Sequence, residues 1–242
     1  MKKFVVMGTM AVLLMACSPG TPFLQPASTP GSAETEHDPS EPAQRYSFFC
    51  TSLDSSPDVQ LSSLEEVWAA SNYLRMKSCK VSYVGPQPFQ PTAEESAAIE
   101  IANPGGVQAS DGLGPYLAAV ELCTRVSDET APGGFADSRK AILQAAVRIC
   151  PEGPQGKIIQ AWAAGRRVGD GRHVVGDAMA PGKFVLMKPV GTVEAQECAW
   201  TVAGADGQVR DRNSSVVALN EVTLQRGEIF TSDKCGIWGK ID

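Results

Sequence analysis

The spacing of hydrophobic residues divides the chain into two regions of different character. Between residues 46 and 165, apolar side chains recur mostly every three or four positions, as in amphipathic helices. From residue 166 onward, apolar and polar positions alternate between closely spaced glycines, which favours short strands. The pattern therefore predicts an α+β protein, with a mainly helical module over 46–165 and a small antiparallel β-sandwich or barrel over 166–242.

Five helices are predicted in the first region. Thr92 and Glu95 have the spacing of a capping box, which marks a helix start, and Asn103-Pro104 marks its end. The segment 79–84 alternates between apolar and polar residues, so it is expected to be a short strand or an extended segment. The predicted helices lie near 61–76, 92–102, 113–123, 142–150 and 154–162.

Eight short β segments are predicted in the second region, separated by turn signals such as Pro181-Gly182 and Asp206-Gly207. Such a density of short strands is typical of antiparallel sandwiches and barrels. The predicted segments lie near 172–176, 183–188, 194–202, 207–210, 215–219, 221–225, 228–232 and 236–240.

The first sixteen residues have the pattern of a signal peptide. Lys2 and Lys3 precede an apolar segment over 4–15, which is too short to span a bilayer core of about 30 Å. The ending Leu14-Met15-Ala16-Cys17 resembles the lipobox of bacterial lipoproteins. The resemblance implies cleavage before Cys17, lipid attachment to its thiol, and anchoring on the extracytoplasmic face of the cell membrane. The alternative is plain secretion after an ordinary signal peptide.

Residues 17–45 are rich in proline and carry several acidic side chains. This segment has too little apolar content to offset the entropy of ordering, so it is predicted to be a disordered tether.

Net charge limits the classes of partner. The chain carries a formal charge of −6, and loss of Lys2 and Lys3 with the signal peptide makes it −8. Nucleic acid is excluded as a partner, because binding to phosphates needs a positive field. The expected partners are the membrane, through the N-terminal lipid, and an envelope protein or a cell-wall glycan.

Six cysteines remain once Cys17 is assigned to the lipid. An even number in an exported chain predicts three disulfides, although six cysteines allow 15 connectivities. Sequential pairing is the simplest of these. Metal ligation is disfavoured because the chain has no CxxC or HxxxH pattern, and no cofactor is predicted. The six residues are Cys50, Cys79, Cys123, Cys150, Cys198 and Cys235.

The second region resembles a small domain of actinobacterial secreted lipoproteins whose function is uncharacterised. That domain opens with DGxWxVGxDIxPGxY and continues with CxW and CGxW, and the corresponding segments here are 170–184, 198–200 and 235–238. His173 stands at an aromatic position of the pattern, and Ala178-Met179 replace Asp-Ile. The resemblance implies a fold and a location, and it implies no reaction.

Two shorter motifs also resemble this group of lipoproteins. Leu122-Cys123 and Ile149-Cys150-Pro151 resemble their LC and LCP helical regions. The resemblance favours a disulfide between Cys123 and Cys150.

One histidine in the folded part is a candidate for catalysis. His173 lies near Asp170, and a nucleophile such as Ser214 or Ser215 would have to come from elsewhere in the fold. This pattern defines the alternative function, an exported cell-wall hydrolase with an unusual site at His173. No GxSxG motif is present, so His173 is interpreted as a strand residue and the protein as a non-enzyme with a binding or structural role.

Two further groups of residues have structural interpretations. Glu65-Glu66, Glu94-Glu95 and Asp128-Glu129 fit helix faces, helix starts or loops better than a catalytic carboxylate pair. The tryptophans are expected in the core, with a sugar-stacking platform as the alternative. They are Trp68, Trp162, Trp200 and Trp238.

Overall fold

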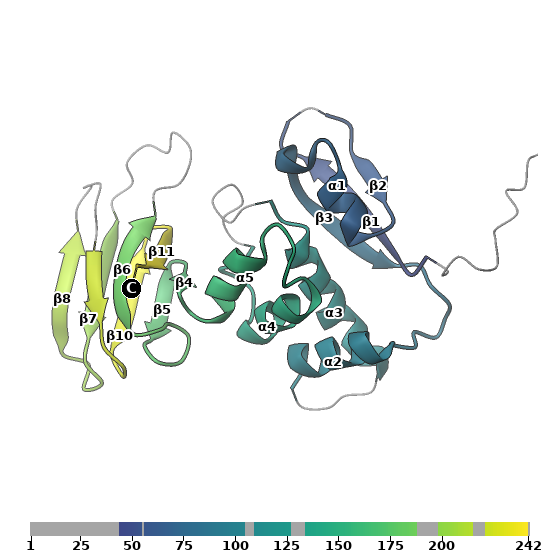
Figure 1. The fold of residues 1–242 in the computed structure, drawn as a ribbon. Helices are drawn as coiled ribbons and strands as arrows, with labels where there is room; N and C mark the ends of the chain where they lie inside the picture. Colours follow the sequence, from purple (N-terminus) through teal and green to yellow (C-terminus); the bar gives the residue numbers. More distant parts are fainter. Residues whose placement is uncertain are drawn as a thin grey trace, which may run out of the picture. The chain divides into compact units, whose positions relative to one another are not determined.

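The computed structural model describes residues 44–54, 56–104, 109–126, 134–187, 198–214 and 221–241 (Figure 1). Cys17, the predicted signal peptide, nearly all of the predicted tether, and the β segment predicted at 215–219 lie outside these residues. The chain is an α+β protein with antiparallel sheets. None of the helices in the described ranges has the length and apolar character needed to cross a membrane.

The first region begins with a sheet that the helical pattern did not predict. β1 (Tyr46–Ser52) pairs antiparallel with β2 (Val59–Leu61) on one side and with β3 (Met76–Tyr83) on the other. In β1 the buried residues Phe48 and Cys50 flank the exposed Phe49, which is the alternation of a strand. The strand expected within 79–84 is confirmed as part of β3.

The helix predicted over 61–76 is much shorter. α1 spans Leu64–Ala69, with Ser63 as its N-cap, and a single 3₁₀ turn follows at Tyr73–Arg75. Ala70 adopts an extended backbone, which ends the helix before Leu74 can join the apolar face. Leu74 is 77% exposed, although the spacing placed it on that face.

Four helices agree with the predictions. They are α2 (Ala93–Ala102), α3 (Ala109–Cys123), α4 (Lys140–Ile149) and α5 (Gly156–Ala163). The predicted capping box is present, because the Thr92 hydroxyl accepts from the Glu95 N–H and the Glu95 carboxylate accepts from the Thr92 N–H.

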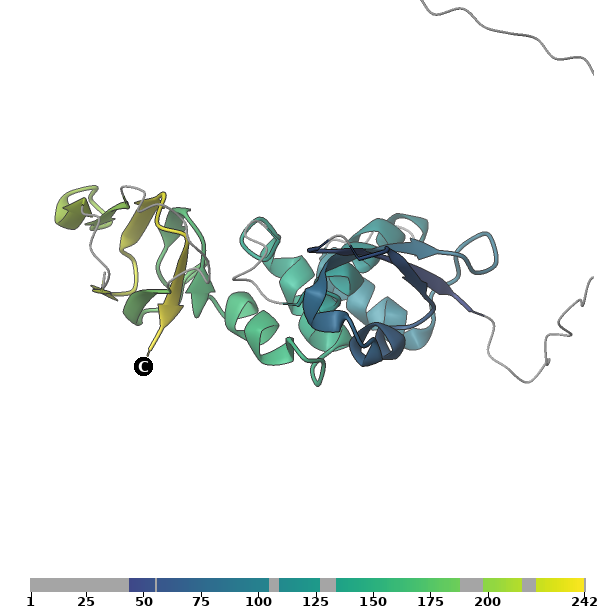
Figure 2. The ribbon, with the colours of Figure 1, turned by 90° about the horizontal axis from the view of Figure 1, so that it is seen from above.

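Two four-stranded antiparallel sheets form the second region, with strand orders β5-β10-β7-β8 and β4-β11-β6-β9. Seven of these strands overlap predicted segments. Residues of both sheets share one buried cluster that includes Phe184, Trp200, Phe230 and Trp238. The strands, green to yellow, are seen from above in Figure 2. Their bounds are β4 Arg167–Val168, β5 Gly171–Val174, β6 Gly182–Met187, β7 Ala199–Ala203, β8 Val209–Ser214, β9 Glu221–Leu224, β10 Ile229–Asp233 and β11 Ile237–Lys240.

The structure contains three disulfides, and their pairing is the sequential one: Cys50–Cys79, Cys123–Cys150 and Cys198–Cys235. The first joins residues directly opposite each other on β1 and β3, with Cα atoms 3.9 Å apart. So close an approach is typical of the pairs in an antiparallel ladder that exchange no backbone hydrogen bonds.

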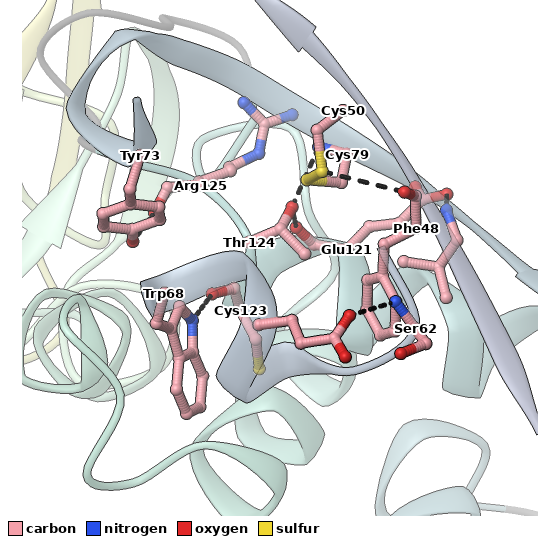
Figure 3. Close-up of a disulfide and its surroundings, with 12 residues drawn as sticks. Phe48, Cys50, Ser62, Trp68, Tyr73, Cys79, Glu121, Cys123, Thr124 and Arg125 are labelled. Atoms are coloured by element: carbon pink, nitrogen blue, oxygen red, sulfur yellow. Dashed lines mark hydrogen bonds between the residues drawn. A yellow bond between two sulfur atoms is a disulfide. The ribbon is translucent and has the colours of Figure 1, made fainter. Parts of the chain in front are cut away.

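Side chains of α3 reach the outer edge of β3 beside this disulfide (Figure 3). The Thr124 hydroxyl, one residue beyond α3, accepts from the main-chain N–H of Cys79 at 3.0 Å. Glu121 accepts from the N–H of Val81 at 3.1 Å. Both N–H groups point away from β1, because their residues belong to pairs without ladder hydrogen bonds. The edge of β3 is therefore hydrogen-bonded to side chains at these two positions.

Candidate binding face

His173 is held on β5, the edge strand of its sheet. One of its ring nitrogens, Nε2, lies 2.9 Å from the carbonyl oxygen of Gly169, and the residue is paired with Phe230 on β10. Ser214 belongs to β8, which forms the opposite edge of the same sheet, and Ser215 lies outside the described residues. The fold therefore does not bring His173 and Ser214 together.

Asp170 is occupied by a different interaction. Its Oδ1 accepts from the N–H of Cys235 at 3.0 Å, and its Oδ2 accepts from the N–H of Gly236 at 2.9 Å. Gly236 has a φ of 89°, in the region that favours glycine. The carboxylate thus fixes the turn between β10 and β11 beside the Cys198–Cys235 disulfide, and it does not orient the His173 ring.

The tryptophans lie in the interior rather than on a platform. Trp162, Trp200 and Trp238 are buried, and Trp200 and Trp238 make an edge-to-face contact with ring centroids 6.2 Å apart. The partly buried Trp68 donates its indole N–H to the carbonyl of Cys123 at 3.0 Å (Figure 3). These rings provide packing, and none of the three buried ones offers a face for stacking on a sugar.

One member of each carboxylate pair that the structure describes, Glu66 and Glu95, has a structural role. Glu66 accepts from the N–H of Ser62 at the start of α1, while Asp128-Glu129 lies outside the described residues. Buried Glu95 accepts hydrogen bonds from Arg45, at 3.0 and 2.6 Å, and from the Tyr46 hydroxyl at 2.6 Å.

These hydrogen bonds set the ionisation of Glu95. Burial opposes its negative charge, but the hydrogen bonds from Arg45, Tyr46 and Thr92 outweigh that cost, and the pKa of Glu95 is lowered. The cluster is a satisfied ion pair that ties the start of β1 to the N-terminus of α2. Within the described ranges, no group of three or more His, Cys, Asp or Glu side chains is placed to hold a metal ion.

The outer face of the β5-β10-β7-β8 sheet is a further candidate site. Side chains alternate along a strand, so the residues that do not enter the shared core form rows across this face. The apolar row consists of Val174, Ile229, Ala203 and Val209, which are paired in that order across the four strands. The polar row consists of Arg172, Thr231, Thr201 and Arg212. On β5, β10 and β7 each member of this row is two residues away from the member of the apolar row on the same strand.

The apolar row is accessible at both ends. Val174 is 40% exposed and Val209 is 57% exposed, while Ile229 and Ala203 between them are partly buried. A β-bulge at the start of β8 shifts the register between Val202 and Ala203, which brings Val209 rather than Arg210 opposite Ala203. The side chain of Arg210 instead forms an ion pair with Glu228 and is not part of this face.

A shallow cavity of about 510 Å³ lies along the polar row. Its small residues Ala199, Thr201 and Thr231 lie between Arg212 and Asp233. Asp233 lies two residues beyond Thr231 on β10, so it is on the side of the polar row away from the apolar row. The remaining lining residues are Trp200, Asn213 and Ser232.

Among the described residues, the two arginines of the polar row lack the ion pairs that arginines elsewhere in the structure form. Arg45 and Arg210 each form an ion pair with a glutamate. Arg172 and Arg212 are exposed, and neither forms an ion pair or a side-chain hydrogen bond within the described part of the chain. The face therefore offers two guanidinium groups to an external ligand.

Sequence reasoning did not find this face. A predicted segment overlaps each of the four strands, although β8 shares only residues 209–210 with its prediction. Arg172 and Arg212 are 40 positions apart, and only the strand order β5-β10-β7-β8 puts them in one row. The available signal was limited to Arg172, which lay in a predicted strand, because Arg212 fell between the segments predicted at 207–210 and 215–219.

Comparisons of the chain with protein-family models, with curated proteins and with solved structures gave no match.

Proposed function

We propose that this chain is a lipid-anchored envelope protein with a non-catalytic binding role. Cys17 carries the anchor on the extracytoplasmic face of the cell membrane, and residues 17–45 form the tether. Beyond it lie a disulfide-linked, mainly helical module and a C-terminal β-sandwich. Three disulfides support this location, because disulfides persist in oxidising compartments outside the cytoplasm.

The observation that carries the binding role is the exposed apolar row. Val174 and Val209 are presented to solvent from the two edge strands of one sheet, with Ile229 and Ala203 between them. A contiguous apolar strip beside polar groups is the composition of an interaction surface. The Asp170 and His173 contacts support a non-catalytic role, because both side chains are used inside the domain.

The test is retention of the folded protein on purified envelope material. A Val174→Ser/Val209→Ser variant removes the apolar ends of the row, and we expect it to lose most of the retention. The matched control is Leu74→Ser/Val84→Ser, which alters two exposed aliphatic residues outside this face. Equal retention by the two variants, or no retention of the wild type above an unrelated lipoprotein, would contradict the proposal.

A second variant separates binding from catalysis. His173→Ala removes the only candidate base of the alternative hydrolase and lies off the outer face. The binding role predicts unchanged retention by this variant. A hydrolytic activity of the wild type that His173→Ala abolishes would replace the proposed function with the enzymatic one.

A further inference from the structure

We infer that Arg172 and Arg212 select the partner of this face, and that the partner is a protein surface presenting carboxylates next to aliphatic side chains. The inference rests on the proposed function and specifies its ligand. It follows from the charge, the spacing and the neighbours of the two arginines.

Charge distribution makes the face complementary to an anion. The chain as a whole is acidic, with a formal charge of −6, and the face also carries Asp233. The two guanidinium groups of the polar row nevertheless form no ion pair with a carboxylate within the described part of the chain, so positive charge exceeds negative charge along this row. Arginine presents a planar fork of N–H donors that matches a carboxylate in a bidentate arrangement. An approaching acidic surface is therefore favoured at this face.

The spacing of the row suits an extended surface rather than a single anion. Arg172 and Arg212 lie on the first and fourth strands of the sheet, so their Cα atoms are roughly 14 Å apart at the usual strand separation. Thr231 and Thr201 occupy the two strands between them and add hydroxyl groups. A ligand that pairs with each arginine above its own strand presents two carboxylates across this span.

The neighbouring apolar row favours a protein over a glycan. Val174, Ile229, Ala203 and Val209 run parallel to the polar row, about 7 Å away along the first three strands. Aliphatic contacts edged by arginine are typical of protein interfaces. Sugar rings are usually held against exposed aromatic faces, whereas Trp200 and Phe230 of this sheet are both buried.

The experiment measures binding of the folded protein to three immobilised polymers. A copolymer of glutamate and leucine carries carboxylates and aliphatic groups on a peptide chain. Polyglutamate carries carboxylates alone, and polygalacturonate carries them on a glycan. We expect the copolymer to bind most tightly, and we expect added salt to weaken its binding, because the charges are exposed.

Two double variants identify the residues responsible. Arg172→Ala/Arg212→Ala is expected to weaken binding of the copolymer about fivefold or more, as two exposed ion pairs are lost. The matched control, Arg75→Ala/Lys77→Ala, removes two positive charges from another part of the chain and is expected to bind like the wild type. Equal weakening by both variants would overturn the inference, because net charge alone would then explain binding.

The outcomes separate this inference from the function on which it rests. If Val174→Ser/Val209→Ser loses envelope retention while Arg172→Ala/Arg212→Ala retains it fully, the face binds its partner but the arginines do not select it. Tighter binding of polygalacturonate than of the copolymer would assign the face to an acidic glycan. If neither variant loses envelope retention, the proposed function and the inference are both contradicted.

Discussion

The carboxylate of Asp170 accepts the main-chain N–H of Cys235, across 65 positions of sequence, and also the N–H of Gly236. It thereby joins the start of β5 to the turn between β10 and β11. Asp170 and Cys235, which belong to the motif segments 170–184 and 235–238, are thus direct hydrogen-bond partners. Their role in this chain is to hold a turn.

Asp170→Ala is expected to destabilise the protein by about 1–3 kcal/mol, because it leaves two backbone N–H groups without their acceptor. Denaturant unfolding followed by tryptophan fluorescence measures the loss. Asp177→Ala is the control, since Lys140 donates to the backbone carbonyl of Asp177 and no described residue donates to its carboxylate. A loss no larger than that of the control would contradict this role.

Glu95→Gln is expected to cost about 3 kcal/mol of stability. The change leaves Arg45 without its ion-pair partner and weakens both the Tyr46 hydrogen bond and the capping box of α2. Glu94→Gln serves as the neighbouring control, because it removes one carboxylate from the same helical turn. Similar unfolding midpoints for the two variants would show that the cluster contributes little.

The stability difference between the wild type and Glu95→Gln should depend on pH. The pKa of Glu95 is lower in the folded protein than in the unfolded chain, where the pKa of glutamate is about 4.3. Its contribution is therefore complete above the unfolded pKa and is lost as the pH falls through the folded pKa. Unfolding free energies measured from neutral pH downward should converge in acid, and a constant difference would contradict this assignment.

Removal of the Cys198–Cys235 disulfide by a double alanine substitution is expected to cost about 3–4 kcal/mol, since the bond closes a long loop in the unfolded chain. The fluorescence of Trp200 and Trp238, which share a core cluster with both cysteines, reports the change. The Cys123–Cys150 double variant is the comparison, because that disulfide joins α3 to the end of α4. An unchanged midpoint for the first variant would contradict the expectation.

Cys17→Ser tests the anchor that the N-terminal pattern predicts. The wild type should partition into the detergent-rich phase of a cloud-point extraction, because acyl chains contribute roughly 0.8 kcal/mol per buried methylene. The variant should stay in the aqueous phase, and Ser18→Ala should behave like the wild type. Aqueous partitioning of the wild type would leave plain secretion as the explanation.

The sequence predicted the helices and strands that carry strong local signals. The capping box at Thr92 and Glu95 placed α2, and alternation with turn signals placed most of the short strands. Strands β1 and β2, and therefore the sheet that they form with β3, were not predicted. The apolar residues Tyr46, Phe48 and Phe49 are too few to distinguish a strand from a helix. β4 has only two residues, so no periodicity could reveal it.

The binding face shows a deeper limit of local patterns. The position of Arg172 on a strand was predictable, and so was its orientation away from His173. The neighbours of each strand in the sheet depend on long-range pairing, which local periodicity does not encode. The presence of three disulfides was easier to predict, because an even number of cysteines indicates pairing, but the sequence left the choice among 15 connectivities open.

The side chains that α3 and the following residue place against β3 affect how copies of this protein can meet. An edge strand with free N–H groups is a template for another strand, and strand addition of that kind leads to aggregation. The N–H groups of Cys79 and Val81 are already engaged by Thr124 and Glu121. A second molecule would have to displace both side chains before it could extend the sheet there. Close approach of many copies of the protein is thus less prone to extend the sheet at this edge.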